Sequence, residues 1–486
     1  MPSSNGRAAV SEKHVVIVGG GFGGLTAARA LAHAPVRITV LDRRNYHLFQ
    51  PLLYQVATAA LNPADIAYPI RSVLSRQRNT RVLLAEARAI DVATKKVVLD
   101  AGEVDYDYLI VATGATHSYF GHDSWSELAP GLKSVEDALE MRRRIFLAYE
   151  AAERETDPVA EQEWLTFVVV GGGPTGVELA GALGEIGLHT LKKDFRAIDS
   201  TAVRVVLCEG KDRVLGTYPE KLSEDAKHAL EKRHVDVRVD TLVTEIDDHG
   251  VTVKGKDGGE HRIGARTVLW AAGVAASPLA ASLPAKRDRS GRVEVEPDLS
   301  IAGHPEVFVI GDLAKVTSDG VEVPGVAQGA IQEGRHVAKM IAGAERTPFR
   351  YHDKGNMATV GRAEAVIATK RFARSGLFAW LVWWVVHIYF LVGFRNRVIM
   401  MFHWAWSWLT YQRGSRLITG AIGKLPPVNE TSLSAPETSS IRGPEPRSSR
   451  PSARARRRSR SGTGAGRARA GVVPASGASA TRRRRS

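Results

Sequence analysis

The sequence of 486 residues predicts an α/β fold with two parallel-sheet domains of the same design, one inserted in the other. Three observations support this fold class. A β-branched run leads into a glycine-rich turn and a helix-forming run at residues 15–32, and the pattern returns at residues 167–181. Two further apolar strands, at residues 108–112 and 306–310, end in turns that fit the first of these units. We therefore expect the second unit to interrupt the first.

The first glycine-rich turn has the spacing of a phosphate-binding loop. A strand at residues 14–18 runs directly into Gly19-Gly-Gly21-Phe-Gly-Gly24, and a helical run follows. Gly19 permits the tight turn, Gly21 lets the backbone approach a pyrophosphate, and Gly24 lets helix and strand pack closely. The next strand ends at Asp42, where a carboxylate can accept hydrogen bonds from ribose hydroxyls. These features predict a Rossmann-like dinucleotide site.

The second turn repeats this arrangement about 150 residues later. It reads Gly171-Gly-Gly173-Pro-Thr-Gly176, and its partner strand ends in Glu209. Glu209 would accept hydrogen bonds from the ribose of NADH, whereas the 2′-phosphate of NADPH would place like charge beside it. Lys211 and Arg213 follow closely and could accommodate such a phosphate, and Glu209 could also be a solvated strand-end acid. NADH is the expected nucleotide at this second site.

The two later strands point to FAD at the first site. One ends at Thr113-Gly114 and the other at Gly311-Asp312. An acid at the end of a strand can bind the hydroxyls of the ribityl chain, which a nicotinamide cofactor lacks.

The lengths between these pieces predict the domain boundaries. An FAD-binding domain is expected to occupy two separate parts of the chain, with the NADH-binding domain between them, followed by an apolar membrane-anchoring region and a disordered Arg-rich tail. The expected ranges are 12–120 and 285–348 for the FAD-binding domain, 121–284 for the NADH-binding domain, 349–425 for the anchoring region and 426–486 for the tail.

The charge of the chain is concentrated in that tail. The formal net charge is +14, but residues 430–486 hold 14 Arg, 3 Glu and no Lys or Asp, which leaves about +3 for the rest. A nucleic-acid partner is therefore not expected for the enzyme part. The tail is a solvated extension, an anchor to anionic lipid headgroups or a segment that binds nucleic acid. The one cysteine, Cys208, excludes a paired-thiol centre and cysteine-held iron–sulfur clusters, and no histidine spacing predicts a metal site.

An apolar, aromatic segment at residues 377–411 predicts contact with a membrane surface. It holds six of the nine tryptophans, and indole rings favour the lipid headgroup boundary. Its first run, residues 377–393, is at the short limit for a hydrocarbon core of about 30 Å. Because basic residues flank both ends, we expect a monotopic anchor or a helical hairpin; a single span and a soluble dimer interface are the alternatives.

Two motifs carry a resemblance to a known family. Residues 45–58 read Asn-Tyr-His-Leu-Phe-Gln-Pro-Leu-Leu-Tyr-Gln-Val-Ala-Thr, and residues 327–334 read Ala-Gln-Gly-Ala-Ile-Gln-Glu-Gly. With the two dinucleotide sites, they resemble the type II NADH:quinone oxidoreductases of the two-dinucleotide-binding-domain flavoproteins. The resemblance runs from about residue 15 to about residue 420, and the tail lies outside it.

The resemblance implies the cofactor contacts. FAD would be bound non-covalently by Gly19, Gly21, Phe22, Gly24, Asp42, Arg43, Thr113, Gly114, Asp312 and Gln328. NADH, the substrate, would be bound by Gly171, Gly173, Thr175, Gly176, Glu178, Glu209 and Gly273. Catalytic roles would fall to Glu178 beside the nicotinamide and flavin, and to Gln328 and Gln332 beside a quinone.

Each catalytic assignment has a plainer alternative. Glu178 could be an acid that favours the helix N-terminus, and the two glutamines could be satisfied structural amides. Four-residue spacing puts Gln328 and Gln332 on one helix face, where uncharged amides could donate to quinone carbonyls. Their neighbours Glu333 and Arg335 could supply protons or be solvated.

The resulting hypothesis is a single-chain enzyme on the cytoplasmic face of the cell membrane. It would pass a hydride from NADH to FAD and two electrons to a membrane quinone, without pumping ions. A homodimer is left open. The alternatives are an NADH reductase for a protein acceptor and a membrane-bound redox sensor.

Overall fold

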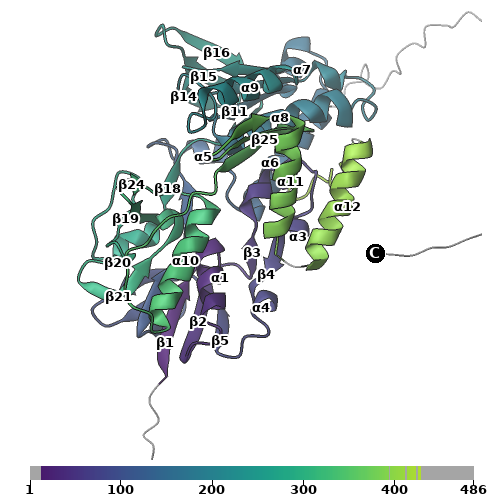
Figure 1. The fold of residues 1–486 in the computed structure, drawn as a ribbon. Helices are drawn as coiled ribbons and strands as arrows, with labels where there is room; N and C mark the ends of the chain where they lie inside the picture. Colours follow the sequence, from purple (N-terminus) through teal and green to yellow (C-terminus); the bar gives the residue numbers. More distant parts are fainter. Residues whose placement is uncertain (1–11, 393, 411–412, 423–424, 428–486) are drawn as a thin grey trace, which may run out of the picture. The chain divides into compact units, whose positions relative to one another are not determined.

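The computed structural model describes residues 12–392, 394–410, 413–422 and 425–427 (Figure 1). Residues 428–486, which make up nearly all of the predicted tail, lie outside the described residues.

The first parallel sheet is built from both ends of the predicted FAD-binding domain. Its strand order is β20-β21-β9-β1-β2-β5, and all neighbours are parallel except β20 and β21. The strands are β1 (Lys13–Val18), β2 (Val36–Asp42), β5 (Thr80–Leu84), β9 (Tyr108–Val111), β20 (Ser300–Ile301) and β21 (His304–Val309). Helices α1 (Phe22–Ala30) and α10 (Ala327–Ile341), far apart in sequence, lie side by side at this sheet (Figure 1). The chain therefore returns to its first sheet after the second unit.

The second parallel sheet has the order β13-β12-β11-β17. It consists of β11 (Thr166–Val170), β12 (Arg204–Cys208), β13 (Val235–Arg238) and β17 (Thr267–Trp270), with α8 (Pro174–Glu185) after β11 and α9 (Glu220–Glu231) after β12. Strands β11, β12 and β17 are rich in apolar residues and almost completely buried, as the central strands of a parallel sheet covered on both faces should be. Cys208 is buried here, and burial raises the pKa of its thiol to about 12, so it is an inert core residue.

Two antiparallel strands connect the two sheets. The chain leaves the first sheet through β10 (Ala115–His117) and returns through β18 (Val274–Ala276), and the two strands pair with each other. Around the second sheet lie α5 (Trp125–Leu128), α6 (Val135–Ala152), α7 (Pro158–Trp164) and the hairpin strands β14 (Leu242–Asp247), β15 (Gly250–Lys254) and β16 (Glu260–Gly264). Around the first lie β3 (Tyr46–Leu48), α2 (Leu53–Ala57), α3 (Pro63–Ile66), β4 (Ala67–Pro69), α4 (Ile70–Val73), β6 (Ala87–Asp91), β7 (Lys96–Leu99), β8 (Glu103–Asp105), β19 (Val293–Glu294), β22 (Ala314–Lys315), β23 (Thr317–Ser318) and β24 (Val321–Glu322).

The C-terminal region is a small sheet followed by two helices. Strands β25 (Asn356–Gly361), β26 (Glu364–Ala368) and β27 (Ala373–Ser375) form an antiparallel sheet that packs on α8 and α9. Helix α11 (Leu377–Phe390) covers this sheet, and α12 (Phe394–Thr410) runs beside α11 (Figure 1). Within the ranges that the structure describes, no helix is long and apolar enough to cross a membrane.

Candidate functional site

The first glycine loop makes the close approaches that the spacing predicts. Gly19 has φ +105°, and a Cβ there would lie 2.4 Å from the carbonyl oxygen of Ala112. A Cβ on Gly24 would lie 1.9 Å from the carbonyl oxygen of Gly19, so helix and turn can meet only without a side chain. In contrast, a Cβ on Gly21 would meet no atom within 4 Å. The face of Gly21 is thus open, as a pyrophosphate-binding backbone requires.

The second loop repeats this geometry. Gly171 has φ +107°, and a Cβ there would lie 2.8 Å from the carbonyl carbon of Ala271. A Cβ on Gly176 would lie 1.8 Å from the carbonyl oxygen of Gly171, whereas one on Gly173 would meet nothing within 4 Å. Gly173 is also the N-cap residue of α8, so the positive end of the helix dipole lies at this open position.

The strand-end acids brace these loops. Asp42 Oδ2 accepts from the amide of Gly20 at 2.6 Å, and Glu209 Oε2 accepts from the amide of Gly172 at 2.6 Å. The second oxygen of Glu209 accepts from the amide of Lys211 at 2.9 Å. Each carboxylate oxygen retains a lone pair, so the predicted ribose contact stays compatible with this bracing. The sequence analysis did not predict these hydrogen bonds from the loop amides. The presence of an acidic residue at the same strand end in both units was a signal for them.

A third acid, which is buried, holds the turn that follows β21. Glu333 on α10 is only 3% exposed, and its Oε2 accepts from the amide of Gly311 at 2.6 Å. Burial raises the pKa of Glu333 to about 7. The suggestion that Glu333 is solvated is therefore wrong; it is a brace for the turn that carries Asp312.

The residues present at the first site fit a flavin nucleotide. The hydroxyl of Thr113 is buried and, among the described residues, has no hydrogen-bond partner. A Cβ on the neighbouring Gly114 would meet nothing within 4 Å, so the backbone is open at Gly114. Phe22 and Asp312 are half-buried, and Arg43 is exposed next to the strand-end acid. An unpaired buried hydroxyl next to an open glycine position in the sequence fits a site that binds a polar ligand.

Three other predicted residues lie around these loops. Thr175 is half-buried in the first turn of α8. Gly273 has φ +69°, and a Cβ there would lie 2.6 Å from the ring of Phe120. Gln328 is half-buried in the first turn of α10.

The amide of Gln332 forms a pair of hydrogen bonds with one backbone residue. Its Nε2 donates to the carbonyl of His352 at 3.0 Å, and its Oε1 accepts from the amide of His352 at 2.9 Å. This geometry favours the structural alternative for Gln332, because both bonds fix the side chain to the backbone.

A cavity of about 110 Å³ lies where α2, α8, β25 and the two C-terminal helices meet. Glu178 lines it from α8 and Tyr54 lines it from α2. Four tryptophans complete its apolar part: Trp380, Trp383, Trp384 and Trp404. Of the described residues that line it, none is Gln328 or Gln332. The structure thus brings Glu178 together with the C-terminal tryptophans, which the sequence did not connect.

Glu178 is held in a poorly hydrated position. Its Oε1 accepts one long hydrogen bond, 3.4 Å, from the amide of Thr359. Burial raises the pKa of Glu178 to about 8, against the weaker opposing effect of the Thr359 amide. A carboxyl group with a pKa near neutrality can gain and lose a proton at working pH, which suits a proton-handling role.

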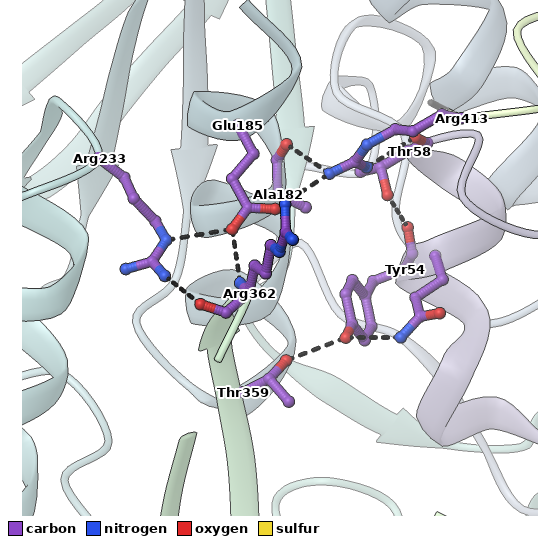
Figure 2. A network of polar contacts seen from close by, with 9 residues as sticks. Tyr54, Thr58, Ala182, Glu185, Arg233, Thr359, Arg362 and Arg413 are labelled. Carbon is purple, nitrogen blue, oxygen red and sulfur yellow. Dashed lines mark hydrogen bonds and ion pairs between the residues drawn. The ribbon is translucent and has the colours of Figure 1, made fainter. Parts of the chain in front are cut away.

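Tyr54 and Gln55, which were quoted in the motif but given no role, form a hydrogen-bonded chain in this cavity. Tyr54 Oη lies 2.9 Å from Thr359 Oγ1 (Figure 2) and accepts from Gln55 Nε2 at 2.9 Å. Trp404 Nε1 in turn donates to Gln55 Oε1 at 2.8 Å. Helix α12 is thereby connected to α2 and to the strand beside Glu178.

Arg413, which the sequence reading missed, joins the C-terminal segment to both domains (Figure 2). Its guanidinium is buried and donates to the carbonyl of Thr58 at 2.9 Å and to that of Ala182 at 3.3 Å. It also pairs with Glu185 at 3.3 Å, and Glu185 pairs with Arg233 at 3.2 Å. Arg413 and Glu185 therefore form a polar part of the cavity lining.

The outer face of the C-terminal helices is apolar and exposed. On α11 four of the exposed apolar side chains recur every four residues, and a fifth is next to the first of them: Leu377, Leu381, Val385 and Tyr389, with Phe378. On the described part of α12 they are Val398, Met401, Phe402, Trp406 and Leu409. Trp383 and His387, in contrast, are buried on the inner face of α11. Such a large apolar patch marks an interaction surface.

Comparison with known proteins identifies the family. The family model for pyridine nucleotide-disulphide oxidoreductases matches residues 13–334. The type II NADH:quinone oxidoreductase NdhA of Mycobacterium tuberculosis is 48% identical over 435 residues, 86% of this chain and 92% of that protein. The type II NADH:quinone oxidoreductase of Staphylococcus haemolyticus is 32% identical over 371 residues, 74% of this chain and 90% of that protein.

Solved structures show the same fold. The structure of NDH2 from Plasmodium falciparum in complex with NADH matches with a TM-score of 0.76 at 19% identity and covers 84% of this chain and 100% of that chain. The sulfide:quinone oxidoreductase of Aquifex aeolicus matches with a TM-score of 0.63 at 21% identity, over 79% of this chain and 92% of that chain. From the glycine loops, the buried acids and these relatives together, we conclude that the chain belongs to the type II NADH:quinone oxidoreductases.

Proposed function

We propose that this protein oxidises NADH and reduces a membrane quinone: NADH, one proton and quinone give NAD⁺ and quinol, with FAD as the carrier and without ion pumping. The observation that carries the proposal is the cavity in which Glu178, next to the NADH loop, meets the tryptophans of the C-terminal helices. FAD, when bound, accepts the hydride and passes its two electrons on. The open cradle at Gly21 and the unpaired hydroxyl of Thr113 support FAD as the occupant of the first site.

The bracing of Glu209 supports NADH over NADPH. Its carboxylate is held in place by the amides of Gly172 and Lys211, so its charge is fixed at the end of β12. A 2′-phosphate would meet that charge. The Arg213 side chain donates to the carbonyl of Gly216 at 3.2 Å, so this cation is already turned to the backbone.

We place the quinone headgroup in the tryptophan-lined cavity. A row of ring contacts leads from the FAD loop to it: Phe22 to Phe49 at 5.8 Å, Phe49 to His387 at 6.1 Å, and His387 to Trp383 at 4.2 Å. These contacts connect the first residue of α1 with the cavity lining and support this placement. Gln328, in the first turn of α10, is proposed to contact the flavin, and Gln332 to position α10 through His352.

Glu178 is the residue that we propose to hold or move a proton during turnover. Burial keeps its carboxyl group protonated at neutral pH, so it can donate to a reduced quinone oxygen or orient the nicotinamide carboxamide.

The exposed apolar face of α11 and α12 is proposed to dock on the cytoplasmic side of the cell membrane. Lys370, Arg371 and Arg374 lie just before α11 and would meet anionic headgroups. Docking would place the cavity next to the lipid from which a quinone enters. Alternatively, the same apolar face would form the interface of a homodimer.

Steady-state turnover with purified protein tests the proposal. NADH loss and quinol formation should match one to one, the released flavin should be FAD, and NADPH should be a poor substrate. Glu178→Gln should lower turnover, whereas the matched variant Glu224→Gln, an exposed acid on α9, should not. If the electrons from NADH reach only a protein acceptor, the assignment of a quinone as the acceptor is wrong.

A further inference from the structure

The tryptophan-lined cavity holds a buried donor that lacks a protein acceptor. The Trp383 side chain is 2% exposed, and its indole N–H has no hydrogen-bond partner among the described residues. Its ring is fixed by stacking on His387 at 4.2 Å and by contact with Trp404 at 5.4 Å. Buried indole N–H groups usually find a partner. Trp383 also lines the cavity, so a ligand that reaches this nitrogen and brings an acceptor would satisfy the donor.

The hydrogen-bonded chain in the same cavity has a fixed direction. The indole of Trp404 can only donate, so the atom of Gln55 that faces it at 2.8 Å must be the amide oxygen. The amide nitrogen of Gln55 then faces Tyr54 Oη at 2.9 Å and donates to it. Tyr54 consequently keeps its own proton to donate elsewhere.

Two acceptors compete for the proton of Tyr54. One is Thr359 Oγ1 at 2.9 Å, which can also reverse the bond and donate to Tyr54. The other is any acceptor that enters the cavity, which Tyr54 lines. When Thr359 donates, both lone pairs of Tyr54 Oη are occupied and its O–H is directed away from them.

We propose that Tyr54 and Trp383 donate hydrogen bonds to a carbonyl oxygen of the quinone, and that Trp404 and Gln55 are positioning residues that fix the direction of the Tyr54 hydroxyl. The inference rests on the proposed function and deepens it. A quinone headgroup suits the site because it is a flat apolar ring that carries only acceptor oxygens. The same donors stabilise the negative charge that gathers on that oxygen during reduction.

Under this proposal, the position of α12 determines the direction of the Tyr54 hydroxyl in the cavity. Trp404 belongs to the helix whose outer face carries the exposed Phe402 and Trp406. A change in how α12 sits would break the bond to Gln55 and leave its amide free to turn. The Tyr54 hydroxyl would then lose the donor that directs it.

Binding to the oxidised holoenzyme in detergent tests the donors without turnover. The probes are 2-methyl-1,4-naphthoquinone and 2-methylnaphthalene, which share a ring but differ in the two oxygens, measured by equilibrium dialysis. Tyr54→Phe and Trp383→Phe should each weaken naphthoquinone binding about 5- to 10-fold and leave hydrocarbon binding unchanged. Trp164→Phe, on α7 outside the cavity lining, is the matched control and should change neither.

A double-mutant cycle tests the positioning residues. Trp404→Phe should weaken naphthoquinone binding in the wild-type background and have no further effect in the Tyr54→Phe background, because it acts through Tyr54. Equal weakening of both probes would show that the variants deform the cavity, and additive effects would show that Trp404 does not act through Tyr54; either result overturns the inference. If the wild-type protein fails to reduce any quinone, the proposed function itself fails, which is a separate outcome.

Discussion

The pKa of Glu178 predicts how the stability of the protein changes with pH. Burial raises this pKa from 4.5 to about 8, so between these values the folded protein keeps a proton that the unfolded chain releases. The stability contribution is fully present below pH 4.5 and is lost as pH rises toward 8. Between pH 5.5 and pH 8.5 the expected loss is about 3 kcal/mol. Glu178→Gln removes this dependence, since glutamine does not titrate.

Thermal unfolding of the holoenzyme at these two pH values measures the effect. The difference in Tm between Glu178→Gln and wild type should shift by about 4 °C in favour of the variant on going from pH 5.5 to pH 8.5, given roughly 400 ordered residues. Comparing variant with wild type at each pH cancels the titration of all other groups. Glu224→Gln, at an exposed position, should give no such shift. A pH-independent difference for Glu178→Gln would show that Glu178 is an ordinary ionised acid, and the proton-handling role would fall.

Three further changes test other parts of the structure. Gly24→Ala places a Cβ 1.9 Å from the carbonyl oxygen of Gly19, so the purified variant should lack bound flavin absorbance; a flavin-loaded variant would refute the loop geometry. Arg413→Met leaves the buried Glu185 with one fewer partner and should cost about 3 kcal/mol in unfolding, whereas Arg416→Met, at a partly exposed pair, should cost under about 1 kcal/mol; equal costs would contradict the buried network. Val385→Asp should abolish sedimentation with anionic vesicles while leaving the fold and the oligomeric state unchanged; a change in oligomeric state instead would identify a dimer interface.

The two dinucleotide loops could be predicted because their determinants are local. Each needs only a strand, three glycines at fixed spacing and an acid at the next strand end, all within about forty residues. The close approaches at Gly24 and Gly176 follow directly from that spacing. The return of the chain to its first sheet was also predictable. The strand before Asp312 does not begin a third glycine-rich unit, so it was expected to complete the first one.

The cavity could not be predicted, because its contacts join distant segments. Gln55 and Trp404 are 349 positions apart, and Thr58 and Arg413 are 355 apart. Periodicity and motif spacing carry no information on such pairs. The contacts of Gln332 could not be predicted for the same reason. Its spacing from Gln328 is visible in the sequence, but its hydrogen bonds to the backbone of His352 are tertiary contacts.

The C-terminal helices could be predicted only in part. The tryptophan-rich composition indicated an interfacial segment, and the apolar residues at four-residue spacing now form one exposed face of α11. Composition alone did not show that Trp383 and Trp404 turn inward, since a helix that is apolar on all sides gives no direction from its sequence.

Anaerobic flavin absorbance of the purified protein tests the central claim most directly. NADH is added first and a short-chain quinone second, while the flavin band is recorded. We expect bleaching by NADH and full recovery with quinone, because the electrons pass through the flavin between the two substrates. Bleaching without recovery would contradict quinone reduction, and no bleaching would contradict the path from NADH to the flavin.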